Sequence, residues 1–239
     1  MTMTTLGIVL SSLKYGDSSL IVRIFTRAAG LKTYMVKGVL KSRRGKLKSA
    51  YFQPLTQLEL VVSHREKAEM HYIREARISV PYASLPTHWT KQAIVLFLSE
   101  VLTKSIREQE KNEPLFDYIA SSLQWLDAHE EVVNFHLVFL MQLTKYLGFY
   151  PDTSGMSNSY FDLVEGVFSK EAGIHPGIQG EELVHFKTLL GTNFEALKNV
   201  QLSKQERRDL LDHLLSYFEV HLQGFNQPKS LAVLHEVFS

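Results

Sequence analysis

Hydrophobic and polar residues alternate along the first 80 residues in short segments, a pattern typical of β-strands. The segments are rich in Ile, Val, Leu, Tyr and Phe, and turn-forming residues separate them. Five strands are predicted, at Leu6–Leu13, Ser19–Thr26, Leu31–Lys37, Leu55–Ser63 and Met70–Ile78. A long loop, Gly38–Ala50, separates the third strand from the fourth. Five short strands at this spacing predict a small closed or partly open barrel.

From Pro86 onward the apolar residues follow the period of an α-helix. Helices are predicted at Thr87–Ile106, Asn112–Leu126, Glu130–Leu147, Glu181–Leu190, Ser203–Gln223 and Lys229–Phe238. Ser203 and Glu206 have the spacing of a capping box at a helix start. Residues 152–180 lose the helical period and are rich in Gly, Ser, Asp and Asn, so an irregular insert with a short hairpin at Tyr160–Phe168 is expected there.

These patterns predict an α+β protein. An N-terminal five-stranded barrel of the oligonucleotide-binding (OB) fold occupies a domain over residues 1–80. An all-helical domain with the irregular insert 152–180 follows over residues 81–239. The content of 45% hydrophobic and 21% charged residues is that of an ordinary globular protein.

The composition also bears on location. The chain has no cysteine, which excludes disulfides and thiolate metal sites and suits a reducing compartment. Its longest apolar runs are too short to span a bilayer, and Met1–Thr5 lacks the features of a secretory signal. We therefore expect a cytoplasmic protein with no membrane partner.

Charge is distributed unevenly along the chain, although the whole chain has a net charge of only +1. Residues 1–80 hold 14 Lys/Arg and 5 Asp/Glu, whereas residues 81–239 hold 12 and 20. The window Ser18–Gln57 has nine basic residues and no acid. A concentrated positive charge on a small β-rich region is typical of a surface that binds nucleic acid. The predicted DNA-binding residues are Lys37, Lys41, Arg43, Arg44, Lys46 and Lys48, with Arg23 on the same face.

Other features of the N-terminal region add less. Arg74 and Arg77 lie on the last strand, where their spacing puts them on opposite faces unless the strand bulges. Outward-facing aromatic residues would stack on unpaired bases, but large aromatic side chains are mostly buried, so a core role is expected for most of them. These aromatic residues are Tyr15, Phe25, Tyr34, Tyr51, Phe52 and Tyr72.

Enzyme motifs are not found in the sequence. Gly38 and Gly45-Lys46 have the wrong spacing for a phosphate-binding loop, and no Ser or Thr follows the lysine. The ten histidines include no pair at i, i+4 of the kind that binds zinc on a helix. We therefore expect no catalytic residue, no cofactor and no bound metal.

Several segments resemble the RecO family of bacterial DNA repair proteins. In the N-terminal region these are Ser18–Thr26, Gly30, Val36-Lys37-Gly38 and Phe52-Gln53-Pro54-Leu55; later ones are Leu143–Pro151 and Tyr160–Phe168. The resemblance covers most of the chain in the right order. It implies an N-terminal OB fold, a C-terminal helical domain and a role as a recombination mediator. Such proteins bind single- and double-stranded DNA, anneal complementary strands, contact the acidic C-terminal tail of the single-strand-binding protein SSB, and act with RecR to load RecA.

The sequence departs from the family at one place, because many members carry a four-cysteine zinc motif in the insert after Pro151. With no cysteine here, no zinc is expected, although His175, His185, Asp162 and Glu165 lie nearby. The SSB tail is acidic and apolar, so it needs an apolar pocket rimmed by Lys or Arg. The candidates for partner binding are Lys145, Arg207 and Arg208.

Three other hypotheses remain open. The first is a protein-interaction adaptor whose OB fold has lost annealing activity and whose basic loop binds an acidic partner. The second is an unrecognised nuclease or other enzyme. In the third, the acidic helical domain folds back on the basic barrel and competes with DNA. The sequence does not decide between single and double strands, and it leaves the RecR site and the oligomeric state open.

Overall fold

The computed structural model describes residues 2–41, 47–64, 68, 70–107 and 110–238. The chain divides into two compact units, which we call the barrel unit (Met1–Ala128) and the helical unit (His129–Ser239). The barrel unit holds 18 Lys/Arg and 11 Asp/Glu and the helical unit 8 and 14, so their net charges are +7 and −6. The uneven charge of the sequence therefore follows the compact units.

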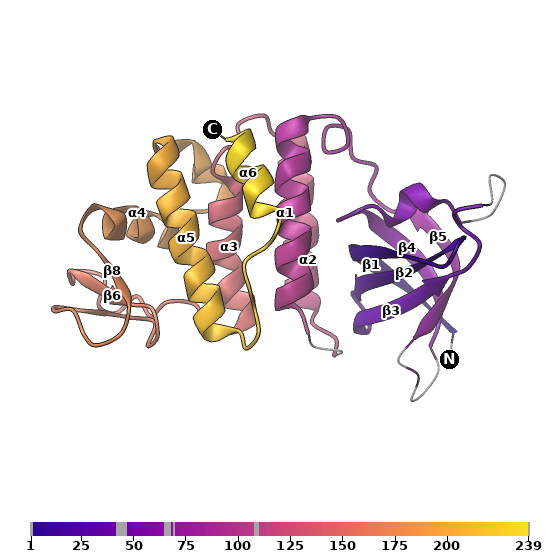
Figure 1. The fold of residues 1–239 in the computed structure, drawn as a ribbon, viewed down its shortest axis with the longest axis horizontal. Helices are drawn as coiled ribbons and strands as arrows, with labels where there is room; N and C mark the ends of the chain where they lie inside the picture. The colour runs from indigo at the N-terminus through magenta and orange to yellow at the C-terminus, as the bar shows by residue number, and fades with distance from the viewer. Residues whose placement is uncertain (1, 42–46, 65–67, 69, 108–109, 239) are drawn as a thin grey trace. The chain divides into compact units, whose positions relative to one another are not determined.

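A closed five-stranded barrel forms most of the barrel unit, in the order β1-β2-β3-β5-β4 with β4 paired back to β1 (Figure 1). The strands are β1 (Thr2–Tyr15), β2 (Ser19–Thr26), β3 (Gly30–Val36), β4 (Gln57–Ser63) and β5 (His71–Ile78). A 3-10 turn, η1 (Ser49–Phe52), precedes β4. The parallel contact between β3 and β5 consists of two residue pairs, Tyr34–His71 and Met35–Tyr72, whereas the other pairings are antiparallel. The predicted α+β fold with an N-terminal OB-like barrel is confirmed.

β1 serves two sides of the barrel because it is long and bends. Its first half pairs with β4 and its second half with β2. Gly7 lies where the halves meet, and a Cβ atom there would come within 2.7 Å of a methyl group of Ile24 and 2.8 Å of one of Leu60, so a larger residue would force these side chains to move. A bulge between Val9 and Ser11 leaves Leu10 outside the ladder, which increases the local bend.

Two helices, α1 (Trp89–Ser105) and α2 (Glu113–Ala128), pack on the barrel within the same unit. The Leu10 carbonyl, which the bulge removes from the ladder, accepts hydrogen bonds from the hydroxyls of Ser99 (2.6 Å) and Thr103 (3.2 Å) on α1. On α2, the Ala120 carbonyl accepts from the buried side chain of Gln57 (3.0 Å). These contacts satisfy polar groups that would otherwise be buried without partners.

The segment that leads from the barrel into α1 is fixed by Asp127, near the end of α2. Its carboxylate accepts from the backbone N–H groups of Ala83, Ser84 and Leu85 at 2.8–2.9 Å. The buried Lys91 donates to the Ser84 hydroxyl (2.6 Å) and to the Asp127 carbonyl (3.0 Å). Burial alone would raise the pKa of Asp127, but the amide hydrogen bonds hold that pKa below its usual value.

The helical unit is built around α3 (Phe135–Leu147), which is buried along most of its length. The helices α4 (Gly180–Leu190) and α5 (Lys204–His221) pack on it and on each other, and η2 (Phe194–Asn199) and α6 (Leu231–Val237) complete the helical elements. A small sheet in the order β7-β6-β8 lies beside α4 (Figure 1). Its strands are β6 (Tyr160–Asp162), β7 (Val167–Ser169) and β8 (Gly177–Gln179).

Several elements differ from the sequence prediction in extent. β1 continues to Tyr15 rather than ending at Leu13, and α3 begins at Phe135 rather than Glu130. The insert 152–180 is more ordered than expected, because β8 adds a third strand to the predicted hairpin. The compact units divide after Ala128, whereas the strand-to-helix change suggested a boundary at residue 80, because α1 and α2 pack on the barrel.

Candidate nucleic-acid interface

Three cations of the basic loop lie in its described parts: Lys37 and Lys41 near its start, and Lys48 near its end. Lys37 follows β3 and is exposed, with Nζ 5.5 Å from the centre of the Tyr72 ring. Lys41 is exposed, and its Nζ lies 4.0 Å from a carboxylate oxygen of Asp17, which is also exposed. Lys48 is exposed just before η1. The predicted ligands Arg43, Arg44 and Lys46 lie outside the described residues.

Apolar residues fix both ends of this loop to the barrel. Val39 is buried in the barrel core, and Leu40 N–H donates to the Ser18 carbonyl in the β1–β2 turn (3.0 Å). On the other side, Leu47 packs against the same core and Phe52 is fully buried in it. Both ends of the loop are therefore anchored on the barrel, and Lys41 is held next to the β1–β2 turn.

The β1–β2 hairpin contributes two residues that the sequence prediction did not include as DNA-binding residues. Lys14 and Tyr15 pair with Leu20 and Ser19 at the end of the hairpin, and both side chains are exposed, Tyr15 by 55%. A tyrosine ring open to solvent beside cations is suited to stacking on an unpaired base. The sequence analysis named Tyr15 among the aromatic residues that would stack if they faced outward, and the structure shows its ring exposed.

The other aromatic residues of the barrel do not present an open face of this kind. Phe25, Tyr34 and Phe52 are buried, as expected for a core, and Tyr51 and Tyr72 are half-buried. The hydroxyl of Tyr34 lies 2.9 Å from Nε2 of His64, whose ring is 4.6 Å from that of His71. Burial, with the neighbouring His71 and Lys32, lowers the pKa of His64 to about 4, so this group is neutral near pH 7.

Arg23 and Arg77 of the barrel are engaged in contacts within the unit. Arg23 is half-buried and donates to the Thr103 carbonyl on α1 (3.3 Å), and burial lowers its pKa. Arg77 donates to the Glu59 carboxylate (2.7 Å). β5 does bulge, because the register shift leaves Arg74 as the extra residue. Arg74 and Arg77 are both exposed, and Arg77 is paired with Glu59.

The candidates for partner binding do not form one site. Arg207 donates to the side chain of Asn134 (2.9 Å), directly before α3, and its guanidinium lies 5.8 Å from the Phe238 ring. Lys204, Arg207 and Arg208 line a small cavity together with Leu211 and Phe238. Lys145 is on the last turn of α3, about 16 Å along the helix axis from Asn134. The structure therefore groups Arg207 and Arg208 with Lys204 and places Lys145 elsewhere.

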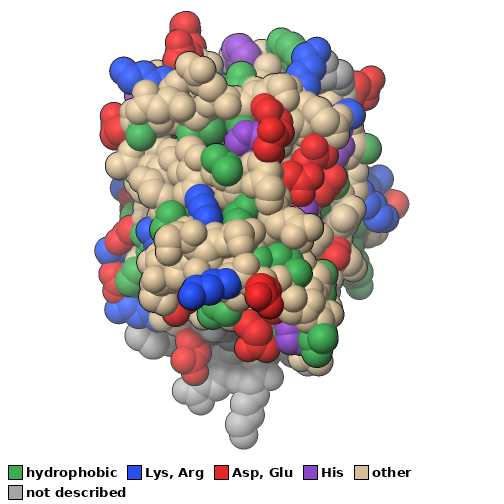
Figure 2. All heavy atoms as spheres, turned by 90° about the vertical axis from the view of Figure 1, so that its left-hand side faces the viewer, with side chains coloured by type: hydrophobic (Ala, Val, Ile, Leu, Met, Phe, Trp, Pro, Cys, Tyr) green, Lys and Arg blue, Asp and Glu red, His purple; other side chains and the backbone are tan. Residues whose placement is uncertain are grey.

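The helical unit has a net charge of −6, and the end of it that carries α4 disfavours a polyanion. Figure 2 faces the end of this unit that carries β6, β8 and α4, and acidic and histidine side chains lie next to one another there. His213 is paired with Glu182 (2.7 Å) and His185 with Glu206 (3.8 Å). The candidate nucleic-acid interface is therefore on the barrel unit, whose net charge is +7.

The insert is held by Asp162 and by aromatic packing. The Asp162 carboxylate accepts from the backbone N–H of Val164 (2.8 Å) and Glu165 (3.0 Å) and lies 3.1 Å from Nδ1 of His175. Phe161 packs on Phe168, Phe186 and Tyr217 with ring centres 4.7–5.7 Å apart. Burial alone would raise the pKa of Asp162, but the amide hydrogen bonds and His175 hold that pKa below its usual value.

The residues of the insert do not match the family's zinc motif. The chain has no thiolate, and Asp162 and His175 are engaged with each other, while His185 faces Glu206. Across the described ranges, no three His, Asp or Glu side chains converge as a metal site would require. None of the described helices is both long and apolar enough to cross a membrane.

Two family models match consecutive parts of the chain. "Recombination protein O N terminal" matches residues 1–82, and "Recombination protein O C terminal" matches residues 86–232. Curated proteins named "DNA repair protein RecO" are similar over their full length and that of this chain. The protein from Christiangramia forsetii is 47% identical, that from Flavobacterium psychrophilum 43%, and that from Phocaeicola vulgatus 36%.

Proposed function

The chain belongs to the recombination protein O (RecO) family of DNA repair proteins, and from that premise we propose that it is a recombination mediator. In this proposal the barrel unit binds single- and double-stranded DNA and anneals complementary strands. The observation that carries it is the set of exposed cations at the two described ends of the basic loop, Lys37, Lys41 and Lys48, on the unit that also exposes the ring of Tyr15.

The mechanism is electrostatic. Each cation that contacts a phosphate releases condensed counterions, which drives binding without regard to sequence. Cations on one surface also lower the repulsion between two strands, so complementary bases can meet. The ring of Tyr15 would hold an unpaired base for this encounter. No covalent bond forms or breaks, so we propose no catalytic residue and no enzymatic activity.

The helical unit supplies the partner contacts in this proposal. Lys204, Arg207 and Arg208 surround a cavity of only about 10 Å³ beside the half-buried ring of Phe238, so a partner would contact its rim rather than enter it. An acidic tail with an apolar end, such as the SSB C-terminal tail, has the complementary chemistry. As the resemblance to the family implies, the protein would act with RecR to assist RecA loading on SSB-coated DNA, at the nucleoid.

The experiment that tests DNA binding replaces three described cations by alanine, Lys37, Lys41 and Lys48. The salt dependence of single-strand affinity, log K against log [salt], should lose a slope of up to about 2, at roughly 0.7 per phosphate contact. The matched control replaces three exposed lysines of the helical unit, Lys170, Lys198 and Lys229, and should leave the slope unchanged. An unchanged slope in the barrel variant would refute the assignment.

A further inference from the structure

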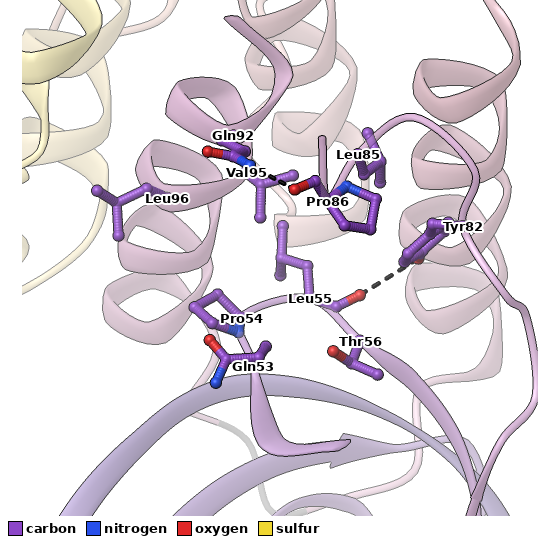
Figure 3. A pocket seen from close by; sticks show the side chains of 10 residues that line it. All are labelled: Gln53, Pro54, Leu55, Thr56, Tyr82, Leu85, Pro86, Gln92, Val95 and Leu96. Atoms are coloured by element: carbon purple, nitrogen blue, oxygen red, sulfur yellow. Dashed lines mark hydrogen bonds between the residues drawn. The ribbon is translucent and has the colours of Figure 1, made fainter. Parts of the chain in front are cut away.

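A cavity of about 420 Å³ lies in the barrel unit, between the segment that precedes β4 and helix α1 (Figure 3). Its volume is within the range of small-ligand sites. The walls are mainly apolar, from Pro54, Leu55, Val95 and Leu96, whereas the amide side chains of Gln53 and Gln92 are exposed at its edge and come from opposite sides. None of its lining residues in the described part of the chain is charged.

The backbone of this cavity is strained at Leu55. Its φ of 57° is the one positive value among the described residues other than glycine. The side chain is fully buried, Leu55 N–H donates to the Val9 carbonyl (2.8 Å), and the Tyr82 hydroxyl donates to the Leu55 carbonyl (3.2 Å). Strain of this kind is kept where the surroundings hold it, and it is concentrated at ligand sites.

The chemistry of the cavity selects a ligand that is flat, uncharged and able to form hydrogen bonds at its edge. A phosphate or a carboxylate would find no cation among the lining residues described. A nucleobase meets all three conditions, since its faces pack on apolar walls and its edges pair with amide groups. We propose that this cavity holds one unstacked base of a single DNA strand, an inference that rests on the proposed DNA-binding function.

The position of the cavity along the chain supports this occupant. Gln53 is five residues after Lys48, so the two Cα atoms are at most about 18 Å apart. A strand whose phosphates contact the loop cations therefore comes within a few nucleotides of the cavity. A single strand can then contact the loop cations with its phosphates and the cavity with one base. Duplex DNA, whose bases are paired and stacked, can contact only the cations.

The test compares two short single strands of equal length in equilibrium binding, one intact and one with a run of abasic sites. The wild type should bind the intact strand more tightly, and the variant Gln53→Ala/Gln92→Ala should lower this preference by roughly five- to tenfold. The double variant should keep the wild-type affinity for duplex DNA and the wild-type dependence of log K on log [salt]. Gln124→Ala, an exposed glutamine on α2 outside the cavity, is the matched control.

A second measurement follows the base directly. The fluorescence of a 2-aminopurine in the single strand should change on binding to the wild type and change less with Gln53→Ala, a single variant that keeps the Gln92 contact with Pro86. Two outcomes would overturn the base site but leave DNA binding intact. One is equal affinity of the wild type for the intact and the abasic strand, and the other is a preference for the intact strand that the double variant retains. A wild type that binds neither strand at low salt would overturn DNA binding as well.

Discussion

Asp162 offers a sharp test of how the insert is held without the family's zinc motif. Its carboxylate is the acceptor for two backbone amides and the partner of His175, and the residue is buried. Replacement by alanine removes all three contacts at once. Replacement by asparagine keeps an acceptor of similar shape but removes the charge.

The magnitude follows from the contacts. A hydrogen bond to a charged group contributes roughly 1.5–3 kcal/mol. Val164 and Glu165, which supply the amides, are exposed, so water partly replaces the carboxylate and the lower end applies. With about 0.5 kcal/mol for the half-exposed His175 pair, Asp162→Ala should lose roughly 3.5 kcal/mol. Asp162→Asn should lose about half of that, because neutral hydrogen bonds are weaker.

The pH dependence has a defined sign. The pKa of Asp162 is lowered in the folded protein, so its contribution is fully present above the unfolded pKa of about 3.9 and is lost as pH falls through the folded value. The stability difference between wild type and Asp162→Ala should therefore be constant near neutral pH and shrink in acid.

The assay is denaturant unfolding followed by circular dichroism, with hydrogen exchange of residues 156–179 to locate the effect. Trp89 and Trp125 are the two tryptophans of the chain and both lie in the barrel unit, so their fluorescence reports on that unit. Glu165→Gln, at an exposed neighbouring carboxylate, is the control. A stability of Asp162→Ala within about 0.5 kcal/mol of the wild type would refute the reasoning.

Other predictions follow from the same structure. Tyr15→Ala should weaken single-strand binding by about 1–3 kcal/mol in a titration and leave duplex affinity unchanged, whereas Tyr15→Phe should keep the stacking; equal losses on both DNAs would contradict this role. Asp127→Ala should destabilise the barrel unit by roughly 3 kcal/mol, read by tryptophan fluorescence, because three backbone amides lose a charged acceptor; an unshifted transition would contradict it. Arg208→Glu should weaken binding of an acidic tail peptide about tenfold in calorimetry, whereas the same change at Lys145 should have little effect. The variant carrying Arg43→Ala, Arg44→Ala, Lys46→Ala and Lys48→Ala should lose affinity about equally for all sequences, and a sequence-dependent loss would argue against phosphate contacts.

The sequence predicted the elements best where packing follows simple alternation. β2 was predicted with its observed bounds because its side chains alternate between the barrel core and less buried positions over most of its length. The end of β1 was missed because Lys14 and Tyr15 are exposed on both faces, so no alternation marks them as strand. β8 was missed because three residues carry too little pattern to be recognised.

The sequence predicted where the positive charge of the candidate interface lies, but it did not predict which of these residues contact other parts of the barrel unit. A window without acids indicated the basic loop, and this information is local in the sequence. The contact of Arg23 with Thr103, 80 residues away, depends on the packing of α1 against the barrel. The cavity beside Leu55 likewise needs residues from before β4 and from α1. Such tertiary contacts have no periodic signal.

The most direct test of the mediator proposal is annealing of two complementary labelled oligonucleotides, with and without SSB coating, across a salt series. The account predicts annealing that continues on SSB-coated strands and weakens as salt rises, because cations of the barrel unit neutralise phosphates. Binding without annealing would contradict the mediator role and favour an adaptor. No binding at low salt would contradict the nucleic-acid interface itself.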